Sequence, residues 1–307
     1  MKSIAVTGAT SFIGNHLIHQ LLPHYNVKAI VRPDSPKINL LPHHPGLSVF
    51  EIDMDEYDRI PEYLGSQNPI DAFIHLAWNG TRGALRNDKK LQEHNLACSV
   101  KILESGVKLG VTTFISAGSQ AEYGPWMKSE KLVETVKPCP NTEYGKAKLD
   151  FYKAALQECR KKEIRFIEPR FFSLYGPGDF EGTMVISMLR NMLQNKECNL
   201  TESVQTWDFL YIDDAVKGLL NLIQDPSASG IYNFGSGDSH PLKWFIEKMY
   251  ELTKSSSKLN FGAIPYPPTG MVNVNPDVSR LMATGWKPGV SFEEGISAII
   301  KIILADV

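Results

Sequence analysis

The sequence is poor in cysteine. Its 307 residues include only four, namely Cys98, Cys139, Cys159 and Cys198. They are scattered, and no two form a Cys-x-x-Cys pair, which argues against a disulfide framework and against a zinc site built on cysteine pairs. Isolated thiols of this kind are typical of proteins kept in a reducing compartment. We therefore expect a cytoplasmic location and no metal.

Long apolar runs and an excess of one charge are also missing. No stretch approaches the ~20 apolar residues that span a bilayer, and the first residues read as a strand rather than as a signal peptide. The formal net charge is −2 and no long basic run occurs. Neither a membrane nor a nucleic acid is therefore expected as a partner. The length permits a large core in one α/β unit or in two lobes.

What the sequence does contain is an alternation of two patterns. Short apolar runs, typical of buried strands, occupy 2–7, 27–31, 47–52, 71–75, 112–116 and 164–167. Amphipathic runs with helical spacing lie between several of them, the longest being 89–109. This alternation predicts an α/β fold with a Rossmann-type, doubly wound parallel sheet, whose ligands bind at the carboxyl ends of the strands.

A glycine-containing turn follows the first strand. Gly8 permits a tight turn, and Gly14 permits the next helix to pack closely on the sheet. The helix N-terminus then presents amide groups and a positive dipole end to a pyrophosphate. Ser11 occupies the place of a middle glycine, so the match to a dinucleotide fingerprint is partial and a plain strand–helix turn is the alternative. The predicted contacts are Gly8, Thr10, Ser11, Phe12, Ile13 and Gly14.

The second strand ends in Val31-Arg32 rather than in an acidic residue. NAD-binding proteins commonly place Asp or Glu there for the ribose 2′-hydroxyl, whereas a guanidinium matches a 2′-phosphate. Arg32 therefore favours NADP, with NAD as the alternative cofactor. An exposed arginine before the turn at Pro33 would have the same pattern.

Three further segments are expected at the cofactor. Asp53 and Met54 follow the third strand and either hold the adenine or form a simple turn. Leu76, Ala77 and Trp78 follow the fourth strand, where small apolar residues can line the crevice. Asn95 lies inside the amphipathic run 89–109, where asparagine is locally unfavourable, so it either bridges polar groups near the cofactor or is exposed.

Tyr144 and Lys148 lie four residues apart in a segment of good helix formers, so they share one helix face. A tyrosine hydroxyl has a pKa near 10, and a neighbouring ammonium favours its ionised form. Such a pair can move a proton to or from an alcohol oxygen. Ser119 leaves a neighbouring strand at the same sheet edge. A surface tyrosine beside a solvated lysine is the alternative reading.

These motifs occur in a fixed order along almost the whole chain: Gly8 to Gly14, Ser119 with Tyr123-Gly124, Tyr144-x-x-x-Lys148, Arg170-x-x-x-x-Tyr175-Gly176-Pro177-Gly178, and Asp208-Phe209-x-Tyr211-x-Asp213-Asp214. The ordered set resembles the extended short-chain dehydrogenase/reductase family of NAD(P)-dependent nucleotide-sugar epimerases, dehydratases and reductases. The resemblance implies a nucleotide-sugar substrate and a homodimer formed through two long helices.

The resemblance also implies residue roles. Tyr144 corresponds to the family's acid–base residue, and Lys148 to the residue that binds the nicotinamide ribose and lowers the tyrosine pKa. Ser119 corresponds to the hydrogen-bond donor for the reacting oxygen. Phe171 and Ser173 fall where the family places residues near the nicotinamide and the sugar.

Two departures from the family's motifs reduce the number of reactions expected for this chain. The family's 4,6-dehydratases carry Asp-Glu after the serine, but this chain has Gln120-Ala121, so dehydration is not expected. Glu122 is one place further and points elsewhere if the segment is extended. Trp207 replaces an arginine that meets substrate phosphates in many epimerases. Gln120 and Trp207 are therefore expected in a different substrate pocket, similar to that of NDP-4-keto-6-deoxyhexose reductases of the CDP-abequose synthase kind.

We therefore predict an NADP(H)-dependent reductase of a nucleotide-linked 4-keto-6-deoxy sugar. An NAD-dependent nucleotide-sugar 4-epimerase is the first alternative, and a non-catalytic dinucleotide sensor is the second. The predicted dinucleotide-binding domain covers 1–170, with 206–236 returning to it. A smaller, interleaved substrate lobe covers 171–205 and 237–307.

Overall fold

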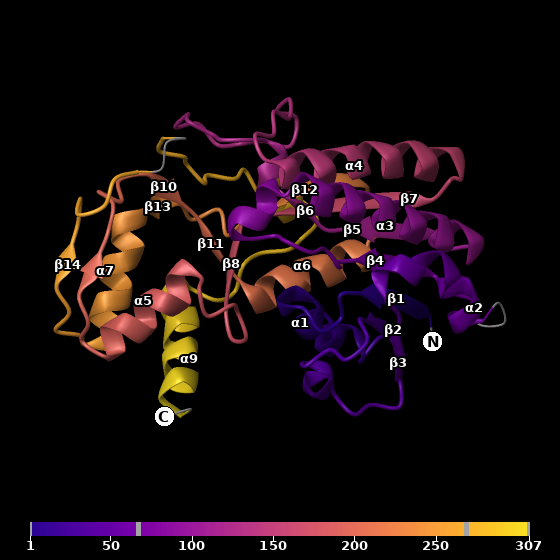
Figure 1. Cartoon of the computed structure of the whole chain (residues 1–307), viewed down its shortest axis with the longest axis horizontal. Coiled ribbons are helices and arrows are strands. Elements are labelled where there is room, and N and C mark those ends of the chain that lie inside the picture. Colours follow the sequence, from indigo (N-terminus) through magenta and orange to yellow (C-terminus); the bar gives the residue numbers. More distant parts are fainter. Residues whose placement is uncertain (1, 66–68, 267–269, 306–307) are drawn as a thin grey trace. The chain divides into compact units, whose positions relative to one another are not determined.

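A computed structural model describes residues 2–65, 69–266 and 270–305; the remaining positions of the predicted domains lie outside the described residues. The chain divides into two compact units that interleave in sequence (Figure 1). Unit 1 contains Met1–Gly124, Val136–Phe171 and Val216–Tyr232. Unit 2 contains Pro125–Thr135, Phe172–Ala215 and Asn233–Val307. The predicted dinucleotide-binding domain included 125–135 and had 206–236 returning to it. In the structure, 125–135 belong to unit 2, and the segment that returns to unit 1 is the shorter Val216–Tyr232.

The central sheet of unit 1 has the strand order β12-β7-β5-β4-β1-β2-β3, with β6 paired to β7. Its strands are β1 (Ser3–Thr7), β2 (Asn26–Val31), β3 (Leu47–Glu51), β4 (Ala72–His75), β5 (Thr113–Ser116), β6 (Gly118–Ser119), β7 (Arg165–Phe171) and β12 (Gly230–Phe234). The pairings among β1 to β7 are parallel. The predicted Rossmann-type parallel sheet is confirmed.

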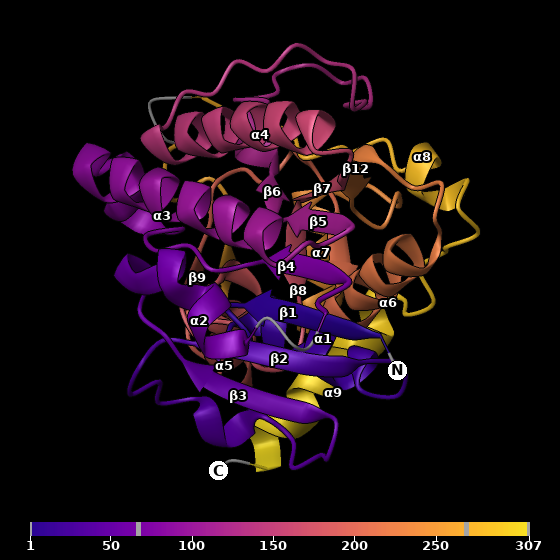
Figure 2. The same cartoon turned by 90° about the vertical axis from the view of Figure 1, so that its right-hand side faces the viewer.

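Helices flank this sheet on both sides. They are α1 (Phe12–Leu21), α2 (Ile60–Leu64), α3 (Lys89–Lys108) and α4 (Glu143–Lys161), with the short 3-10 helices η1 (Ile38–Leu40), η2 (Met54–Arg59), η3 (Gly83–Asn87) and η4 (Gln120–Glu122). Figure 2 shows α3 and α4 side by side on one face of the sheet. Their buried faces close a core with β4 and β5 around Phe73, Phe114 and Phe151. Right-handed crossovers place α1 on the opposite face.

The strand order reverses between β1 and β4, because the chain runs outward from β1 through β2 and β3 and then returns to the other side of β1. In open parallel sheets ligands bind at such a switch point, outside the carboxyl ends of the strands. Beneath it, the His75 ring contacts the Thr7 hydroxyl at 2.8 Å and the Ser99 hydroxyl at 2.9 Å. Burial lowers the pKa of His75 to about 3, so this ring is a neutral core group.

Unit 2 is organised around aromatic side chains. Its elements are β8 (Ser173–Tyr175), α5 (Met184–Leu193), β9 (Cys198–Asn199), β10 (Thr206–Trp207), β11 (Phe209–Tyr211), β13 (His240–Pro241), α7 (Leu242–Thr253), β14 (Leu259–Asn260), α8 (Ser279–Met282) and α9 (Phe292–Ala305), and α6 (Ile212–Gln224) begins in it. Phe209, Phe245 and Phe292 pack with ring centroids 4.7–5.7 Å apart. The buried Asp208 carboxylate accepts bonds from the amides of Ser236 and Gly237.

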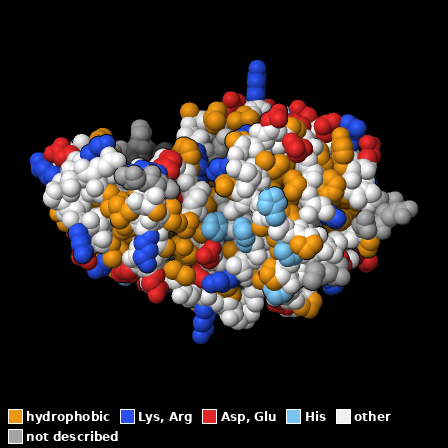
Figure 3. Space-filling view, turned by 90° about the horizontal axis from the view of Figure 1, so that it is seen from below, with side chains coloured by type: hydrophobic (Ala, Val, Ile, Leu, Met, Phe, Trp, Pro, Cys, Tyr) orange, Lys and Arg blue, Asp and Glu red, His pale blue; other side chains and the backbone are white. Residues whose placement is uncertain are grey.

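The surface is of mixed charge where Figure 3 shows it. Acidic and basic side chains are interspersed on that face, in keeping with the formal net charge of −2. Within the described ranges, no helix combines the length and the apolar character needed to cross a membrane.

Replacement of Gly14 by alanine should destabilise unit 1. A Cβ atom there would lie 2.1 Å from the Gly8 carbonyl oxygen, so α1 must move away from the turn. Overpacking of this kind typically costs ~1–3 kcal/mol. Urea unfolding measures the cost. Gly289→Ala is the matched control, because its nearest contact is at 3.7 Å and its φ is not positive. Equal midpoints for the two variants would contradict the close packing.

Candidate active site

The glycine turn forms a tight cradle at the end of β1. Gly8 has a φ of +69°, and a Cβ there would lie 2.8 Å from the Ala77 amide nitrogen after β4. The Ser11 hydroxyl caps α1 by accepting the Gly14 amide at 3.0 Å. The amides of Phe12 and Ile13 lie in the first helical turn, which has no intrahelical acceptors. They and the helix dipole suit an anion.

Other predicted cofactor residues follow the carboxyl ends of the first three strands. The Thr10 hydroxyl contacts the Ser35 hydroxyl at 3.0 Å. Arg32 follows the end of β2 with an exposed side chain. Asp53 caps η2 by accepting the Asp55 amide at 3.0 Å. This is the turn role, one of the two roles that the sequence allows for Asp53.

Asn95 fastens the loop after β4. It is fully buried, donates to the Asn79 carbonyl at 2.8 Å and accepts the Asn79 amide at 3.1 Å. Of the two predicted alternatives, the structure shows the bridging one. One turn earlier on α3, Gln92 Oε1 accepts the Trp78 indole N–H at 2.8 Å. Together these bonds fix the position of Trp78. The Asn79 side-chain Nδ2 donates to the Met54 sulfur at 3.2 Å.

Tyr144 and Ser119 meet directly. Thr142 caps α4, so Tyr144 is the second residue of the helix, and its phenol hydrogen-bonds the Ser119 side chain. Gly145 makes this approach possible, since a Cβ there would lie 2.4 Å from the Ala121 carbonyl oxygen. The Tyr144 ring is 7% exposed, so its hydroxyl is held in a largely water-free place.

Lys148 lies one turn further along α4 and is also buried. Its ammonium donates to the Ala117 carbonyl at 2.8 Å and lies 3.7 Å from the centre of the Trp78 ring. Burial lowers the pKa of Lys148 to about 8, against the opposing charges of Glu122 and Glu168. The loop residue Trp78 therefore covers the lysine, and Asn95 supports that loop.

The expected lowering of the Tyr144 pKa is wrong for this structure. Burial raises the pKa of the phenol, and the effects that oppose burial are the Ser119 hydrogen bond and the positive charge of Arg86. Lys148 directs its ammonium to Ala117 and Trp78 instead. No sequence motif pointed to Arg86, whose guanidinium carbon lies 4.6 Å from the Tyr144 ring centre. Its Nη1 donates to the Thr81 carbonyl, which fixes η3 beside the tyrosine.

A buried network of charged side chains supports the backbone of Ser119. The expectation that Glu122 points elsewhere assumed an extended segment, but the chain turns into η4, and Glu122 Oε1 accepts the Ser119 amide at 2.8 Å. Its other oxygen lies 2.9 Å from Arg170 Nη2, and Arg170 Nε donates to Glu168 at 2.7 Å. Gly118 leaves room for them, since a Cβ there would lie 2.8 Å from Glu168. Sequence reasoning missed this network.

The remaining predicted residues lie in two places. Phe171 ends β7 and is in register with Ser119 on β6, while Gln120 begins η4, so both adjoin Ser119 in the chain or in the sheet. Ser173 and Trp207 belong to unit 2. Ser173 pairs with Phe209, and Trp207 pairs with His240. The Trp207 indole nitrogen is buried and has no hydrogen-bond partner among the described residues.

A glycine cradle at the switch point of a parallel sheet, together with a buried serine, tyrosine and lysine, defines an NAD(P)-dependent enzyme. The profile of the "NAD dependent epimerase/dehydratase family" matches residues 4–235. The chain therefore belongs to this family, within the extended short-chain dehydrogenase/reductases that the ordered motifs indicated.

Individual relatives span the whole chain. The chain is 27% identical to CDP-abequose synthase of Salmonella muenchen, over 98% of each sequence. It is 24% identical to GDP-6-deoxy-D-mannose reductase of Pseudomonas aeruginosa, over 98% of this chain and 96% of the relative. The solved UDP-glucose 4-epimerase of Thermotoga maritima superposes with a TM-score of 0.87, at 23% identity and over 99% of both chains. The last likeness shows the fold.

Proposed function

We propose that the protein is an NADP(H)-dependent reductase of a nucleotide-linked 4-keto-6-deoxy sugar. The observation that carries the proposal is the buried contact between the Ser119 hydroxyl and the Tyr144 phenol, with neutral Gln120 and Ala121 where a dehydratase needs two carboxyl groups. The names of two relatives, CDP-abequose synthase and GDP-6-deoxy-D-mannose reductase, support the substrate class.

The cofactor fits the residues that are present. The cradle of Gly8 and Gly14 admits no side chain and offers first-turn amides to a pyrophosphate. Lys148 is buried beside Trp78 and suits a ribose hydroxyl. Phe171 adjoins Ser119 in the sheet, where a nicotinamide face would lie against it. A bound nicotinamide supplies the hydride.

The protein's part in the reaction is to move one proton. Ser119 donates a hydrogen bond to the keto oxygen, and Tyr144 transfers its phenolic proton to that oxygen as the carbon is reduced. Lys148 holds the ribose, and the Ser119 hydrogen bond and the positive charge of Arg86 stabilise the resulting phenolate. One hydride and one proton together convert the keto group to an alcohol. Gln120, Ser173 and Trp207 are proposed to contact the sugar or its diphosphate.

The test is NADPH oxidation by the purified protein with 4-keto-6-deoxy hexoses linked to CDP, UDP, GDP and dTDP. We expect turnover with at least one of them, with the alcohol as product. No consumption of NADPH with any of the four would refute the reductase assignment.

A 4-epimerase is the second candidate, because the family includes epimerases and the same serine, tyrosine and lysine serve both reactions. Such an enzyme cycles a retained NAD. Release of stoichiometric NAD from the denatured protein as purified would favour it, whereas an empty protein that prefers NADPH would favour the reductase. A homodimer through α3 and α4 is also proposed, and light scattering after gel filtration tests it.

Arg32→Ala should weaken the preference for NADPH over NADH. Arg32 follows β2 and is exposed, so its guanidinium is available to a 2′-phosphate, and a hydrogen bond to a charged group is worth ~1.5–3 kcal/mol. We therefore expect kcat/KM for NADPH to fall by about 10- to 100-fold and that for NADH to change little. Arg160→Ala, an exposed arginine at the end of α4, is the control. Equal losses with both cofactors would contradict the assignment.

A further inference from the structure

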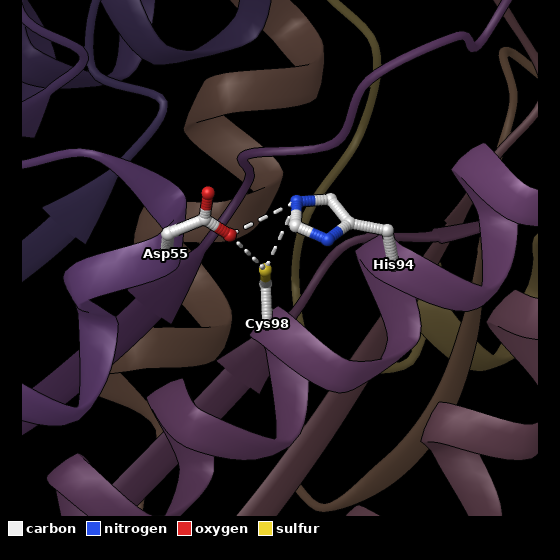
Figure 4. A group of neighbouring side chains, drawn as sticks. All are labelled: Asp55, His94 and Cys98. Carbon is white, nitrogen blue, oxygen red and sulfur yellow. Dashed lines mark hydrogen bonds and ion pairs between the residues drawn. The ribbon is translucent and has the colours of Figure 1, made fainter.

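Three potential metal ligands converge on the surface of unit 1 (Figure 4). Asp55 lies in η2, and His94 and Cys98 lie one turn apart on α3. Because residues four apart share a helix face, the histidine and the cysteine both point at the segment that carries Asp55. The cysteine spacing alone predicted no metal site, since the third ligand comes from a distant segment that the fold brings beside α3.

The distances between the three ligand atoms fit one tetrahedral ion. His94 Nε2 lies 3.3 Å from Asp55 Oδ1 and 3.5 Å from Cys98 Sγ. The Cys98 Sγ–Asp55 Oδ1 distance is 4.0 Å. Zinc bonds of ~2.0–2.3 Å at tetrahedral angles place such ligand atoms about 3.3–3.6 Å apart. Two of the three separations already match, and the third closes with a small movement of the exposed Asp55 side chain.

Hydrogen bonding alone explains this convergence poorly. A ring nitrogen of histidine carries either one hydrogen or one lone pair, yet Nε2 lies within reach of both Asp55 and Cys98. The sulfur–oxygen separation of 4.0 Å is at the outer limit of a hydrogen bond. A cation placed between the three atoms satisfies all of them at once.

The surroundings provide support and access. Lys101 donates to the Asp55 carbonyl and pairs with Asp58 at 3.2 Å, which ties η2 to α3 and neutralises the lysine. Cys98 is 2% exposed, whereas the side chains of His94 and Asp55 are 45% and 71% exposed. The sulfur therefore approaches from the protein side, and a water can complete the coordination from solvent.

We propose that Asp55, His94 and Cys98 form a binding site for a divalent transition-metal ion, zinc above all. Nitrogen, sulfur and carboxylate oxygen together favour zinc or cobalt over magnesium or calcium, which take oxygen ligands. The ion would clamp η2 to α3. Because η2 runs from Met54 to Arg59 and is capped by Asp53, a bound ion would also stiffen this segment.

The test uses the untagged, chelator-treated full-length protein and cobalt(II) as a probe. A thiolate ligand gives cobalt a ligand-to-metal charge-transfer absorption that histidine and carboxylate do not, so the spectrum reports Cys98 itself. We expect one cobalt ion per chain with this absorption, displacement by zinc, and a higher Tm in the presence of zinc.

Cys98→Ser should abolish the charge-transfer absorption and weaken zinc binding by on the order of 100-fold or more. This is a larger loss than the removal of a residue that only supports a metal ligand would cause. Cys139→Ser is the matched control, because Cys139 is exposed and lies outside the cluster, and it should change nothing. His94→Gln and Asp55→Asn alter exposed side chains, so they test the site even if the buried Cys98 variant folds poorly. A cobalt spectrum without thiolate character, or unchanged zinc affinity in these variants, would overturn the proposal. Neither result bears on NADPH turnover, which tests the proposed function separately.

Discussion

Tyr144→Phe should lower kcat for the proposed reduction by about 10²- to 10⁴-fold, the range that a positioned general acid contributes. The substitution removes only the hydroxyl that contacts Ser119, and the ring keeps its place beside Arg86. Cofactor affinity should therefore stay unchanged. Tyr152→Phe is the matched control, because it removes a hydroxyl from the same helix at a position packed against Phe166. Steady-state kinetics and cofactor titration measure both effects.

The pH profile separates the two titrating groups of the site. Burial raises the pKa of Tyr144, so its phenol keeps its proton throughout the neutral range. The pKa of Lys148 is lowered to about 8, so its ammonium is lost as the pH rises through that value. We therefore expect the rate of reduction to fall above about pH 8 because Lys148 loses its charge. Lys148→Met should leave a slower enzyme without this alkaline limb. A variant that retains the limb would exclude Lys148 as its source.

The sheet could be predicted because its signals are local. Apolar runs mark β1 to β5, and Gly8 and Gly14 mark the turn at the switch point. Apolar character and the small size of glycine are properties of the residues themselves, so they can be read from the sequence. The site was predicted only in part. Tyr144 and Ser119 belong to recognisable motifs, and the contact between their side chains follows from the order of the strands.

The features of the site that could not be predicted from the sequence depend on a backbone turn, on burial, or on residues distant in the chain. Glu122 was read as pointing away because a strand alternates its faces, but the 3-10 turn η4 directs it back to Ser119. The direction of the Tyr144 pKa shift was misread because burial cannot be seen in the sequence, and it outweighs a nearby charge. Asn95 had two open interpretations, and its loop partner Asn79 decided between them only in three dimensions.

Arg170→Met should destabilise the protein by about 3–5 kcal/mol, the usual cost of removing one partner from a buried ion pair. The guanidinium is fully buried, pairs with Glu122 and Glu168, and has its central carbon 4.4 Å from the Tyr123 ring centre. Its loss leaves two carboxyl groups without a positive partner. Urea midpoints measure the change, provided that the slope of unfolding free energy against urea stays constant.

The exposed Arg59 provides the control for this substitution. It also pairs with two carboxylates, Glu56 and Glu62, but in solvent. Arg59→Met should therefore leave the midpoint unchanged, because exposed pairs contribute little to stability. Glu122→Gln and Glu168→Gln combined with Arg170→Met should recover part of the loss, because neutral amides need no counter-charge. A triple variant less stable than Arg170→Met alone would show that packing, not charge, dominates the network.

The cost of Arg170→Met should also depend on pH. Burial, followed by the nearby charge of Glu122, raises the pKa of Glu168 well above that of an ordinary carboxyl group. The folded state therefore binds this proton more tightly than the unfolded state, and stability falls as the pH rises from the unfolded pKa through the folded one. Removing the guanidinium raises the folded pKa further, so the variant loses more stability at about pH 8 than at about pH 5.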